Sequence, residues 1–193
     1  MTERLITHAD GVTRCWWCGT DPLYVQYHDD DWGRPVHDER ELFEKIVLDG
    51  AQAGLAWITI LRKREGYRRA FEGFVPEVVA AYEEPDIERL LADPGIVRNR
   101  QKVNAAIGNA RALLAMHESG ETLVDLVWSH APEPRKKPLK PTDPLPATSP
   151  EGDALSKALV QRGFKFVGPT IVYAFMQAVG VIDDHLAGCW RAS

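Results

Sequence analysis

The sequence has few cysteines and no long apolar run. Its three cysteines are an odd and small number, which argues against a disulfide framework and favours metal ligation or plain burial. No apolar stretch approaches the ~18 residues of a membrane span, so we expect no membrane contact. The first eleven residues lack the apolar core of a signal peptide. These absences exclude a disulfide-stapled secreted scaffold and a membrane protein, and we expect a cytoplasmic chain.

The chain also lacks the excess of positive charge that is typical of nucleic-acid-binding proteins, because its formal net charge is -5 at pH 7. Three basic clusters nevertheless occur, at residues 62–69, 98–111 and 135–140. Segregated clusters can present a basic face on an acidic protein. Solvated helix faces are the alternative, and charge alone favours that interpretation over DNA binding.

At 193 residues the chain is long enough for one domain with a sizeable core, and we expect residues 1–193 to form a single helical domain. Apolar residues recur at helical spacing, and no segment has a clear strand pattern. Asp38 and Glu41 have the spacing of a capping box before one such segment. The predicted fold class is all-α, with helices over residues 41–48, 58–74, 76–84, 85–93, 96–118, 122–130, 153–164 and 169–180.

Proline is concentrated in one stretch. Residues 131–152 contain seven prolines, which exclude a helix or a central strand there. Helical periodicity resumes directly after this stretch, and too few residues follow it to form a separate core. We therefore expect a proline-rich surface excursion from one domain rather than a linker between two.

The two ends of the chain carry residues that can ligate a metal. His185 and Cys189 have H-x-x-x-C spacing, which on a helix would place both on one face as half of a tetrahedral zinc site. The other half must come from the opening residues. Spacing allows either Cys15 with Cys18 or Cys15 with His28. Either set would be closed, and therefore structural rather than catalytic; buried thiols without a metal are the alternative.

Several ordered motifs resemble the 3-methyladenine DNA glycosylase I family of helix-hairpin-helix glycosylases. The motifs are PLYVQYHDDDWG, LDGAQAGLAWITILRKRE, PGIVRNRQKVNAAIGNA, LSKALVQRGFKFVGPT and DHLAGC. They cover the chain from about residue 14 to residue 189, apart from the proline-rich excursion. The resemblance implies a helix-hairpin-helix fold in which one structural zinc joins the terminal segments. The implied ligands are Cys15, His28, His185 and Cys189, which leaves Cys18 without a role.

The resemblance also implies which residues contact double-stranded DNA. It places the hairpin at residues 93–97, where Gly95 lets the backbone approach closely and the helix that follows offers unpaired N–H groups to a phosphate. Arg98 and Lys102 add positive charge just beyond the hairpin. Such contacts grip the DNA backbone without reading sequence. Gly54 and Leu55 are implied as the wedge that fills the gap left by an extruded base.

An extruded base needs a pocket, and five aromatic residues near these motifs are candidates for its wall. Core packing is the alternative, and we assign at least two of the five to it. Stacking contributes about 1–3 kcal/mol per base, and a cationic alkylated purine adds a cation–π attraction. Tyr27 and Trp57 are the preferred stacking residues by resemblance. The full set is Trp17, Tyr24, Tyr27, Trp32 and Trp57.

The family has a glutamate at the position of Asp49, which we expect to be the catalytic carboxylate of the pocket. An ordinary residue at a helix C-terminus is the alternative for Asp49. The implied reaction hydrolyses the N-glycosidic bond of N3-methyladenine in alkylated DNA, releasing the base and leaving an abasic site. The base is already cationic, so no general acid is required. No lysine is positioned for Schiff-base chemistry, so we expect a monofunctional enzyme without lyase activity. We also expect the protein to be monomeric.

Two other functions remain open. A damage-sensing protein of the same fold could bind alkylated or abasic DNA with little turnover, because Asp49 is one methylene shorter than glutamate. A thiol oxidoreductase could use Cys15 and Cys18 at C-x-x-C spacing, but the pair lacks a βαβ context.

Overall fold

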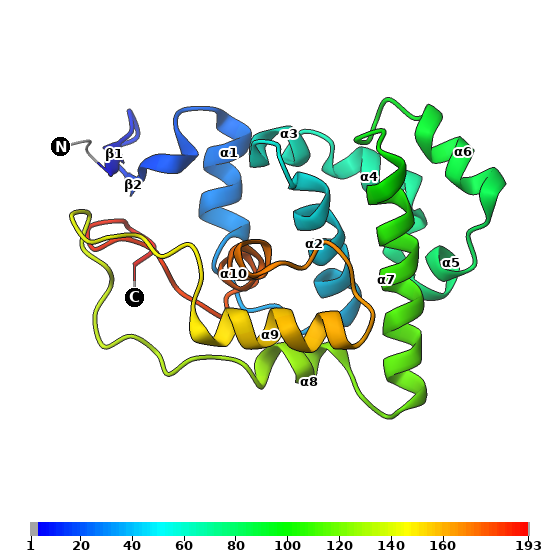
Figure 1. The fold of residues 1–193 in the computed structure, drawn as a ribbon. Helices are drawn as coiled ribbons and strands as arrows, with labels where there is room; N and C mark the ends of the chain where they lie inside the picture. The colour runs from blue at the N-terminus through cyan, green and yellow to red at the C-terminus, as the bar shows by residue number, and fades with distance from the viewer. Residues whose placement is uncertain (1–3, 193) are drawn as a thin grey trace.

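A computed structural model describes residues 4–192, and they are mostly helical (Figure 1). The long helix α7 lies on one side of the molecule, and β1, β2 and the C-terminal segment lie on the opposite side. In the described part of the chain, no helix is long and apolar enough to cross a membrane. The α-helices are α1 (Pro22–Gln26), α2 (Glu39–Gln52), α3 (Trp57–Leu61), α4 (Arg64–Ala70), α5 (Pro76–Ala80), α6 (Glu84–Ala92), α7 (Arg100–Glu118), α8 (Leu123–Trp128), α9 (Pro150–Gln161) and α10 (Pro169–Ala178).

Side-chain caps explain where several helices begin. The Asp38 carboxylate accepts a hydrogen bond from the Glu41 amide at 2.9 Å, so the predicted cap at Asp38 is confirmed, and α2 begins at Glu39 rather than at residue 41. Asn99, Thr122 and Ser149 cap α7, α8 and α9 in the same way. Each cap satisfies an amide that has no partner within the helix.

One predicted helix is wrong, because residues 58–74 form three short helices instead of one. The helix is interrupted between α3 and α4, where the Lys63 amide donates to the carbonyl of Ile60, three residues back. It breaks again before the 3-10 turn η3 (Glu72–Phe74), in which Gly73 has φ +70°. Helical periodicity in the sequence does not reveal these breaks, because the apolar positions on both sides still face one core.

The sequence shows no clear strand, yet two short strands pair near the N-terminus. Strands β1 (Leu5–Thr7) and β2 (Thr13–Cys15) are antiparallel, with Leu5 opposite Cys15. The amide of Trp190 donates to the carbonyl of Thr13 at 2.9 Å, so the C-terminal segment lies against this hairpin. Strands of three residues are too short for alternation to be recognised.

Helix α2 is the centre of the core. It contacts α3, α7, α8 and α10, and α10 in turn packs on α9. The face of α2 that includes Leu42, Phe43 and Ile46 is buried in the main apolar cluster. The last two turns of α2 are buried throughout, from Ile46 to Ala51. The C-terminal end of α2 is therefore firmly held by packing.

The turn before α7 is fixed by helix α4. The long helix begins at Arg100 rather than at residue 96, and residues 93–97 form a turn in which Asp93 accepts the Gly95 amide at 2.6 Å. Gly66 of α4 packs directly on this turn, since a Cβ built on Gly66 would lie 2.3 Å from the carbonyl oxygen of Gly95. The Tyr67 hydroxyl accepts the Val97 amide at 3.2 Å.

Lys102, predicted to contact DNA, has a structural contact. Its Nζ donates to the carbonyl oxygens of Ala51 and Ala53, at 2.7 Å each. An ammonium on the last carbonyls of a helix caps it and complements its dipole. The first turn of α7 is thereby tied to the end of α2 and to the loop that follows it.

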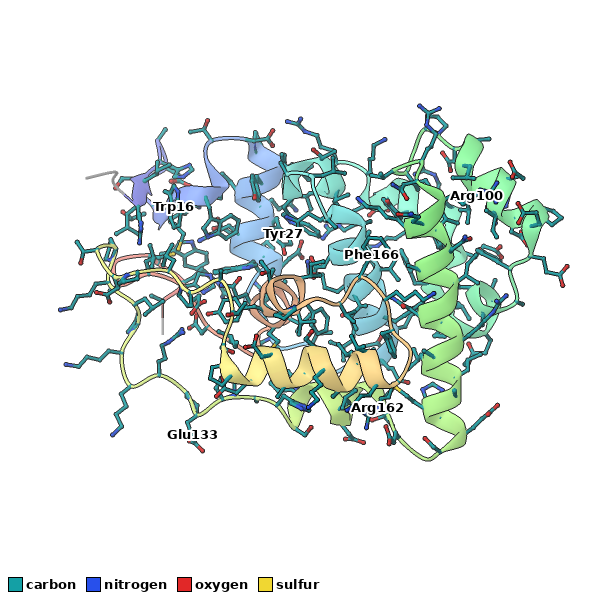
Figure 2. The ribbon with its side chains drawn as sticks, in the orientation of Figure 1. Trp16, Tyr27, Arg100, Glu133, Arg162 and Phe166 are labelled. Atoms are coloured by element: carbon teal, nitrogen blue, oxygen red, sulfur yellow. The ribbon has the colours of Figure 1, made fainter. Side chains whose placement is uncertain are left out.

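The proline-rich excursion is anchored at several points. It runs from residue 131 to residue 149 rather than 152, because Pro150 begins α9. Leu139 pairs with Leu186, and the Arg4 guanidinium donates to the Asp143 carbonyl at 2.5 Å. Arg135 forms an ion pair with Asp184. Several polar side chains of the excursion are exposed, among them Lys136, Lys137 and Glu133, which Figure 2 labels.

We expect Gly66→Ala to destabilise the protein by about 1–3 kcal/mol, because the new methyl group meets backbone that cannot move aside. Gly108→Ala is the matched control, since nothing lies within 4 Å of a Cβ built there and alanine favours a helix interior. Urea unfolding of both variants measures the difference. Equal stability of the two variants would contradict the close approach of α4 to the turn.

Lys102→Met should lower the free energy of unfolding by about 1–3 kcal/mol, because two charge-assisted hydrogen bonds are lost. Hydrogen exchange should also become faster at residues 51–55. Gln101→Met, at an exposed neighbour on α7, is the control. If stability stays unchanged and only the salt dependence of DNA binding falls, Lys102 acts on phosphate instead.

Candidate functional site

All five aromatic residues that the sequence assigned to a base pocket line one cavity of about 270 Å³. They come from η1 (Trp16–Cys18), α1, the π-helical turn η2 (Tyr27–Asp31), its C-cap and α3. Figure 2 shows Tyr27 in the middle of the molecule, near α1 and α10. The residues of the lining are Trp16, Trp17, Tyr24, Tyr27, Trp32, Lys45, Asp49, Gln52, Trp57, Leu145, Pro146, Ala174, Gln177 and Asp184.

The aromatic rings support one another as well as lining the cavity. The ring centroids of Trp17 lie 5.3 Å from Tyr24 and 4.9 Å from Trp32, and those of Tyr27 and Trp57 lie 5.4 Å apart. Tyr27 and Trp32 are buried, whereas Trp17, Tyr24 and Trp57 are only partly so. The same aromatic rings therefore pack against one another and line the cavity.

Asp49 faces this cavity from the last turn of α2, and its side chain is only 3% exposed. One carboxylate oxygen, Oδ1, accepts a hydrogen bond from Lys45 at 2.6 Å. The other, Oδ2, is buried and has no hydrogen-bond partner among the described residues. Burial raises the pKa of Asp49, and the charge of Lys45 opposes that rise. Burying an acceptor without a hydrogen-bond donor costs free energy, so a donor that entered the cavity would be favourable at Asp49 Oδ2.

Lys45 is a site residue that the sequence reasoning missed. Its Nζ lies 3.7 Å from the ring centroid of Trp57 and 5.8 Å from that of Tyr27. Burial lowers the pKa of Lys45, and the Asp49 charge opposes this. The i,i+4 spacing of Lys45 and Asp49 on a helix was the available signal. The Nε1 of Trp57 is also buried without a described partner, so the wall offers one free donor and one free acceptor.

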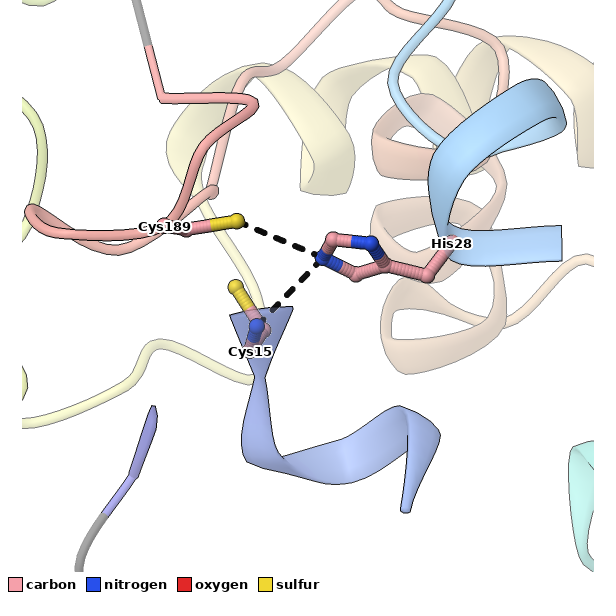
Figure 3. A group of neighbouring side chains, drawn as sticks. All are labelled: Cys15, His28 and Cys189. Atoms are coloured by element: carbon pink, nitrogen blue, oxygen red, sulfur yellow. Dashed lines mark hydrogen bonds between the residues drawn. The ribbon is translucent and has the colours of Figure 1, made fainter. Parts of the chain in front are cut away.

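A second buried group lies beside the pocket. Cys15, His28 and Cys189 each bring one ligand atom to a cluster in which all three atoms lie within 4.8 Å of one another (Figure 3). The Cys189 Sγ is 3.4 Å from the His28 Nε2. Cys18 stays outside this cluster, since its thiol donates to the Cys15 carbonyl at 3.1 Å.

His185 lies next to this group. It is 2% exposed, its ring centroid is 5.3 Å from that of His28, and its Nε2 has no hydrogen-bond partner among the described residues. His185 and Cys189 do not share a helix face, so that premise of the sequence reasoning is wrong. A turn closed by the Cys189 amide on the Leu186 carbonyl, at 2.8 Å, follows His185 instead. It places Cys189 in the cluster, while His185 lies beside His28 and is not one of the three residues whose ligand atoms converge.

Two aspartates orient the histidine rings. Asp29 contacts the Nδ1 of His28 and Asp183 contacts the Nδ1 of His185, at 2.8 Å each. A proton held at Nδ1 leaves the Nε2 lone pair as an acceptor or metal ligand. In His28 this atom accepts the Cys15 amide at 3.4 Å. The sequence signals, H-D at residue 28 and D-x-H at residue 183, were not used in the prediction.

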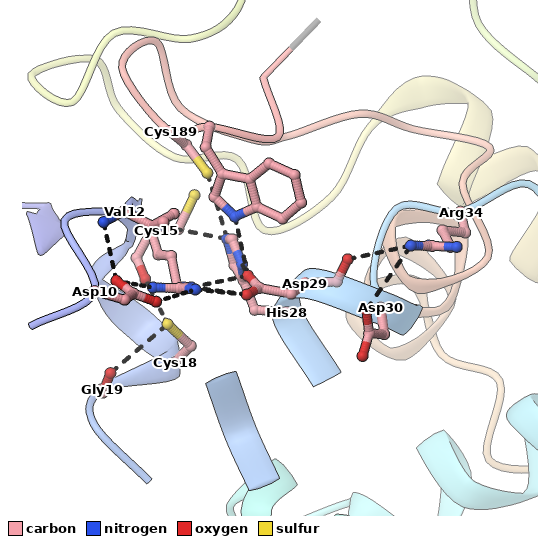
Figure 4. A network of polar contacts seen from close by, with 12 residues as sticks. Asp10, Val12, Cys15, Cys18, Gly19, His28, Asp29, Asp30, Arg34 and Cys189 are labelled. Atoms are coloured by element: carbon pink, nitrogen blue, oxygen red, sulfur yellow. Dashed lines mark hydrogen bonds and ion pairs between the residues drawn. The ribbon is translucent and has the colours of Figure 1, made fainter. Parts of the chain in front are cut away.

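Asp29 is itself firmly held (Figure 4). The Arg14 guanidinium donates to its carboxylate at 2.8 and 2.9 Å, and Trp190 donates at 3.0 Å. Burial would raise the pKa of Asp29, but the hydrogen bonds from Arg14 and His28 lower it to about 2. The carboxylate that orients His28 is therefore ionised at neutral pH.

The donors that converge are of the kinds that bind metal ions. They are two buried thiols and one buried imidazole, from Cys15, Cys189 and His28, with the buried imidazole of His185 beside them. A hydrogen bond between the two thiols lowers the pKa of Cys189 and raises the pKa of Cys15, so Cys189 is the one favoured as a thiolate. The unpaired Nε2 of His185 is explained if it completes such a set.

The residues predicted to contact DNA lie around the end of α2 and the start of α7. Gly54 has φ +78° and is exposed, and Leu55 is an apolar side chain with 40% exposure. Gly95 lies in the turn before α7, and Arg98 is exposed directly after it. Lys102 joins these two places through its hydrogen bond to Ala53. Arg100, labelled in Figure 2, is paired with Glu84 and Glu88 on α6.

Comparison with known proteins gives the same picture over nearly the whole chain. A sequence profile of the family described as methyladenine glycosylase matches residues 17–192. DNA-3-methyladenine glycosylase 1 of Escherichia coli (strain K12) is 53% identical over 179 residues, which are 92% of this chain and 96% of that protein.

Solved structures agree. A crystal structure of 3-methyladenine DNA glycosylase I has a TM-score of 0.89 and 52% identity, covering 93% of this chain and 100% of that chain. A tyrosine-to-phenylalanine variant of 3-methyladenine DNA glycosylase I in complex with 3-methyladenine has a TM-score of 0.84 and 36% identity, covering 92% and 96%. Sequence and fold agree over the same residues, and the chain belongs to the methyladenine glycosylase family.

Proposed function

We propose that this protein is a DNA glycosylase that hydrolyses the N-glycosidic bond of N3-methyladenine in alkylated DNA. The free base is released and an abasic site remains. The observation that carries this proposal is the aromatic cavity in which the buried Asp49 keeps one carboxylate oxygen unpaired. A flipped cationic purine would satisfy both features at once.

The pocket residues divide the work of recognition. Tyr27 and Trp57 stack on the base, and the other aromatic residues hold these two rings in place. Asp49 Oδ2, which has no partner in the described part of the chain, accepts a hydrogen bond from the exocyclic amino group of adenine.

Catalysis in this proposal rests on binding the flipped, strained nucleotide more tightly than the stacked one. The alkylated base already carries positive charge and is a good leaving group, so water can attack the sugar without general-acid help. As the glycosidic bond breaks, the bonding electrons return to the base, which becomes neutral, and positive charge builds on the sugar; the negative charge of Asp49 stabilises this cationic sugar.

For DNA binding, we propose that α6, the turn at residues 93–97 and α7 form a helix-hairpin-helix that grips the phosphate backbone. The Gly95 turn and Arg98 supply the contacts. Gly54 and Leu55 enter double-stranded DNA as the wedge, because their loop is exposed and tied to α7 through Lys102. One domain acting as a monomer is sufficient for all of these contacts.

We propose that the buried donor set binds one zinc ion through Cys15, His28, His185 and Cys189. The support is the chemistry of the donors and the unpaired Nε2 of His185. A bound ion there would be structural, because four protein ligands leave no position for substrate. It would hold η1 and η2, which carry pocket residues, against the C-terminal segment.

A second candidate function is a sensor of alkylated or abasic DNA with little turnover. The observation that favours it is the ion pair between Lys45 and Asp49, which neutralises the pocket carboxylate. Asp49 is also one methylene shorter than the glutamate that the family resemblance implies.

Base release from methylated DNA tests the first candidate against the second. The wild type should release 3-methyladenine, and Asp49→Asn should lower the rate about 10–100-fold, because a charged acceptor contributes about 1.5–3 kcal/mol. Asp153→Asn, an exposed change on α9, is the control for loss of one negative charge. Tight binding to abasic-site DNA without release would support the sensor, and unchanged turnover in Asp49→Asn would refute its role in the pocket.

Metal analysis of the purified protein should return about one zinc per chain. Cys15→Ser and Cys189→Ser should lose it, because each removes a thiolate ligand. His185→Ala should bind it more weakly. Cys18→Ser should keep it, since that thiol only donates to a backbone carbonyl. Loss in Cys18→Ser with retention in His185→Ala would show that the ligand set is wrong.

A further inference from the structure

Lys45 occupies the part of the pocket that suits a cation. Its ammonium lies 2.6 Å from Asp49 Oδ1 and 3.7 Å from the ring centroid of Trp57. A carboxylate beside an aromatic face is the environment that attracts a cationic base. The protein itself therefore fills this position, with a side chain that is 15% exposed.

A cationic base and the Lys45 ammonium cannot share this position. Both would contact the Trp57 ring and compete for the Asp49 carboxylate, and like charges at short range in a partly buried site repel strongly. With Lys45 in place the pair carries no net charge, so the attraction for a cation is largely cancelled. Entry of the base requires the ammonium to move.

A second cavity offers a place for it. This cavity, of about 370 Å³, shares Tyr27, Lys45 and Trp57 with the base pocket, so these side chains separate the two spaces. Besides Lys45, its lining contains four carboxylates and three guanidinium groups, so one negative charge is left over. The charged residues are Asp30, Asp31, Glu41, Glu44, Arg34, Arg64 and Arg68.

Asp31 is the acceptor best placed to receive the ammonium. Burial and the charge of Arg64 lower the pKa of Lys45, whereas the charges of Asp49 and Asp31 raise it. Asp31 is paired with Arg64 at 2.7 Å and is 41% exposed, which leaves acceptor capacity on its second oxygen. The flexible four-carbon stem of a lysine can redirect its ammonium without movement of α2.

We propose that Lys45 is a specificity-determining residue. This inference rests on the proposed function of the pocket. The Lys45 ammonium holds the cation position until an alkylated base enters, and then moves to the acidic cavity at Asp31. An undamaged, neutral purine brings no charge to replace the ammonium at Asp49, so its entry leaves a buried carboxylate uncompensated. The pocket thereby rejects normal bases and admits cationic ones.

The test compares base release by wild type, Lys45→Met and Lys45→Arg. Methionine keeps the side-chain length and helix preference but removes the charge. Lys45→Met should lower KM for methylated DNA at least fivefold with kcat nearly unchanged, and should raise the release of undamaged adenine at least tenfold. Lys45→Arg keeps a cation and should retain the selectivity of the wild type. Lys157→Met, on the exposed face of α9, controls for the loss of one positive charge.

Asp31→Asn tests where the ammonium goes. It should raise KM in the wild-type background and have no effect in the Lys45→Met background. An equal effect in both backgrounds, a fall in kcat in Lys45→Met, or an unchanged KM would overturn the proposal. Failure of the wild type to release 3-methyladenine would instead reject the proposed function itself, so the two failures are distinguishable.

Discussion

The convergence of Cys15, His28 and Cys189 within 4.8 Å is the constraint on which the rest of the site depends. Three segments that are distant in sequence meet there: β2, η2 and the C-terminal turn. His28 and the neighbouring His185 both contact the wall of the pocket. The ring centroids of Trp17 and His28 are 5.2 Å apart, and those of Trp32 and His185 are 4.5 Å apart. The buried donor cluster therefore fixes the wall against which a base would stack.

Charge in the pocket is balanced within the protein. A lone buried carboxylate is strongly destabilising, and removing one partner of a buried ion pair costs about 3–5 kcal/mol. Lys45 relieves this cost for Asp49 without satisfying Oδ2. The pocket is thus stable when empty of base and still keeps one strong acceptor for it. Recognition of a cation then becomes an exchange of one positive charge for another, which favours selectivity over tight binding.

The segments proposed to contact DNA are tied to the end of α2 and to α4 through backbone carbonyls as well as by packing in the core. Lys102 holds the end of α2, and Lys63 donates to the carbonyl of Pro94 in the turn before α7 at 2.5 Å. Two of the basic residues that suggested DNA binding therefore act on the protein itself. Their ammonium groups keep their charge but are engaged by backbone carbonyls, so fewer basic side chains are free to contact phosphate than the sequence indicated.

Local signals in the sequence determined most of the helices, the cap at Asp38 and, through the family motifs, the membership of the aromatic pocket. These features depend on the spacing of residues along one segment or on continuous sequence motifs that resemble a family. Only the tertiary structure decided where the helix within residues 58–74 is interrupted, that Lys102 donates to the end of α2, and that a turn rather than a helix connects His185 to Cys189. It also decided that Lys45 fills the pocket beside Asp49. These features depend on which backbone atoms and charges lie opposite a side chain across the fold, and periodicity within a segment carries no information about them.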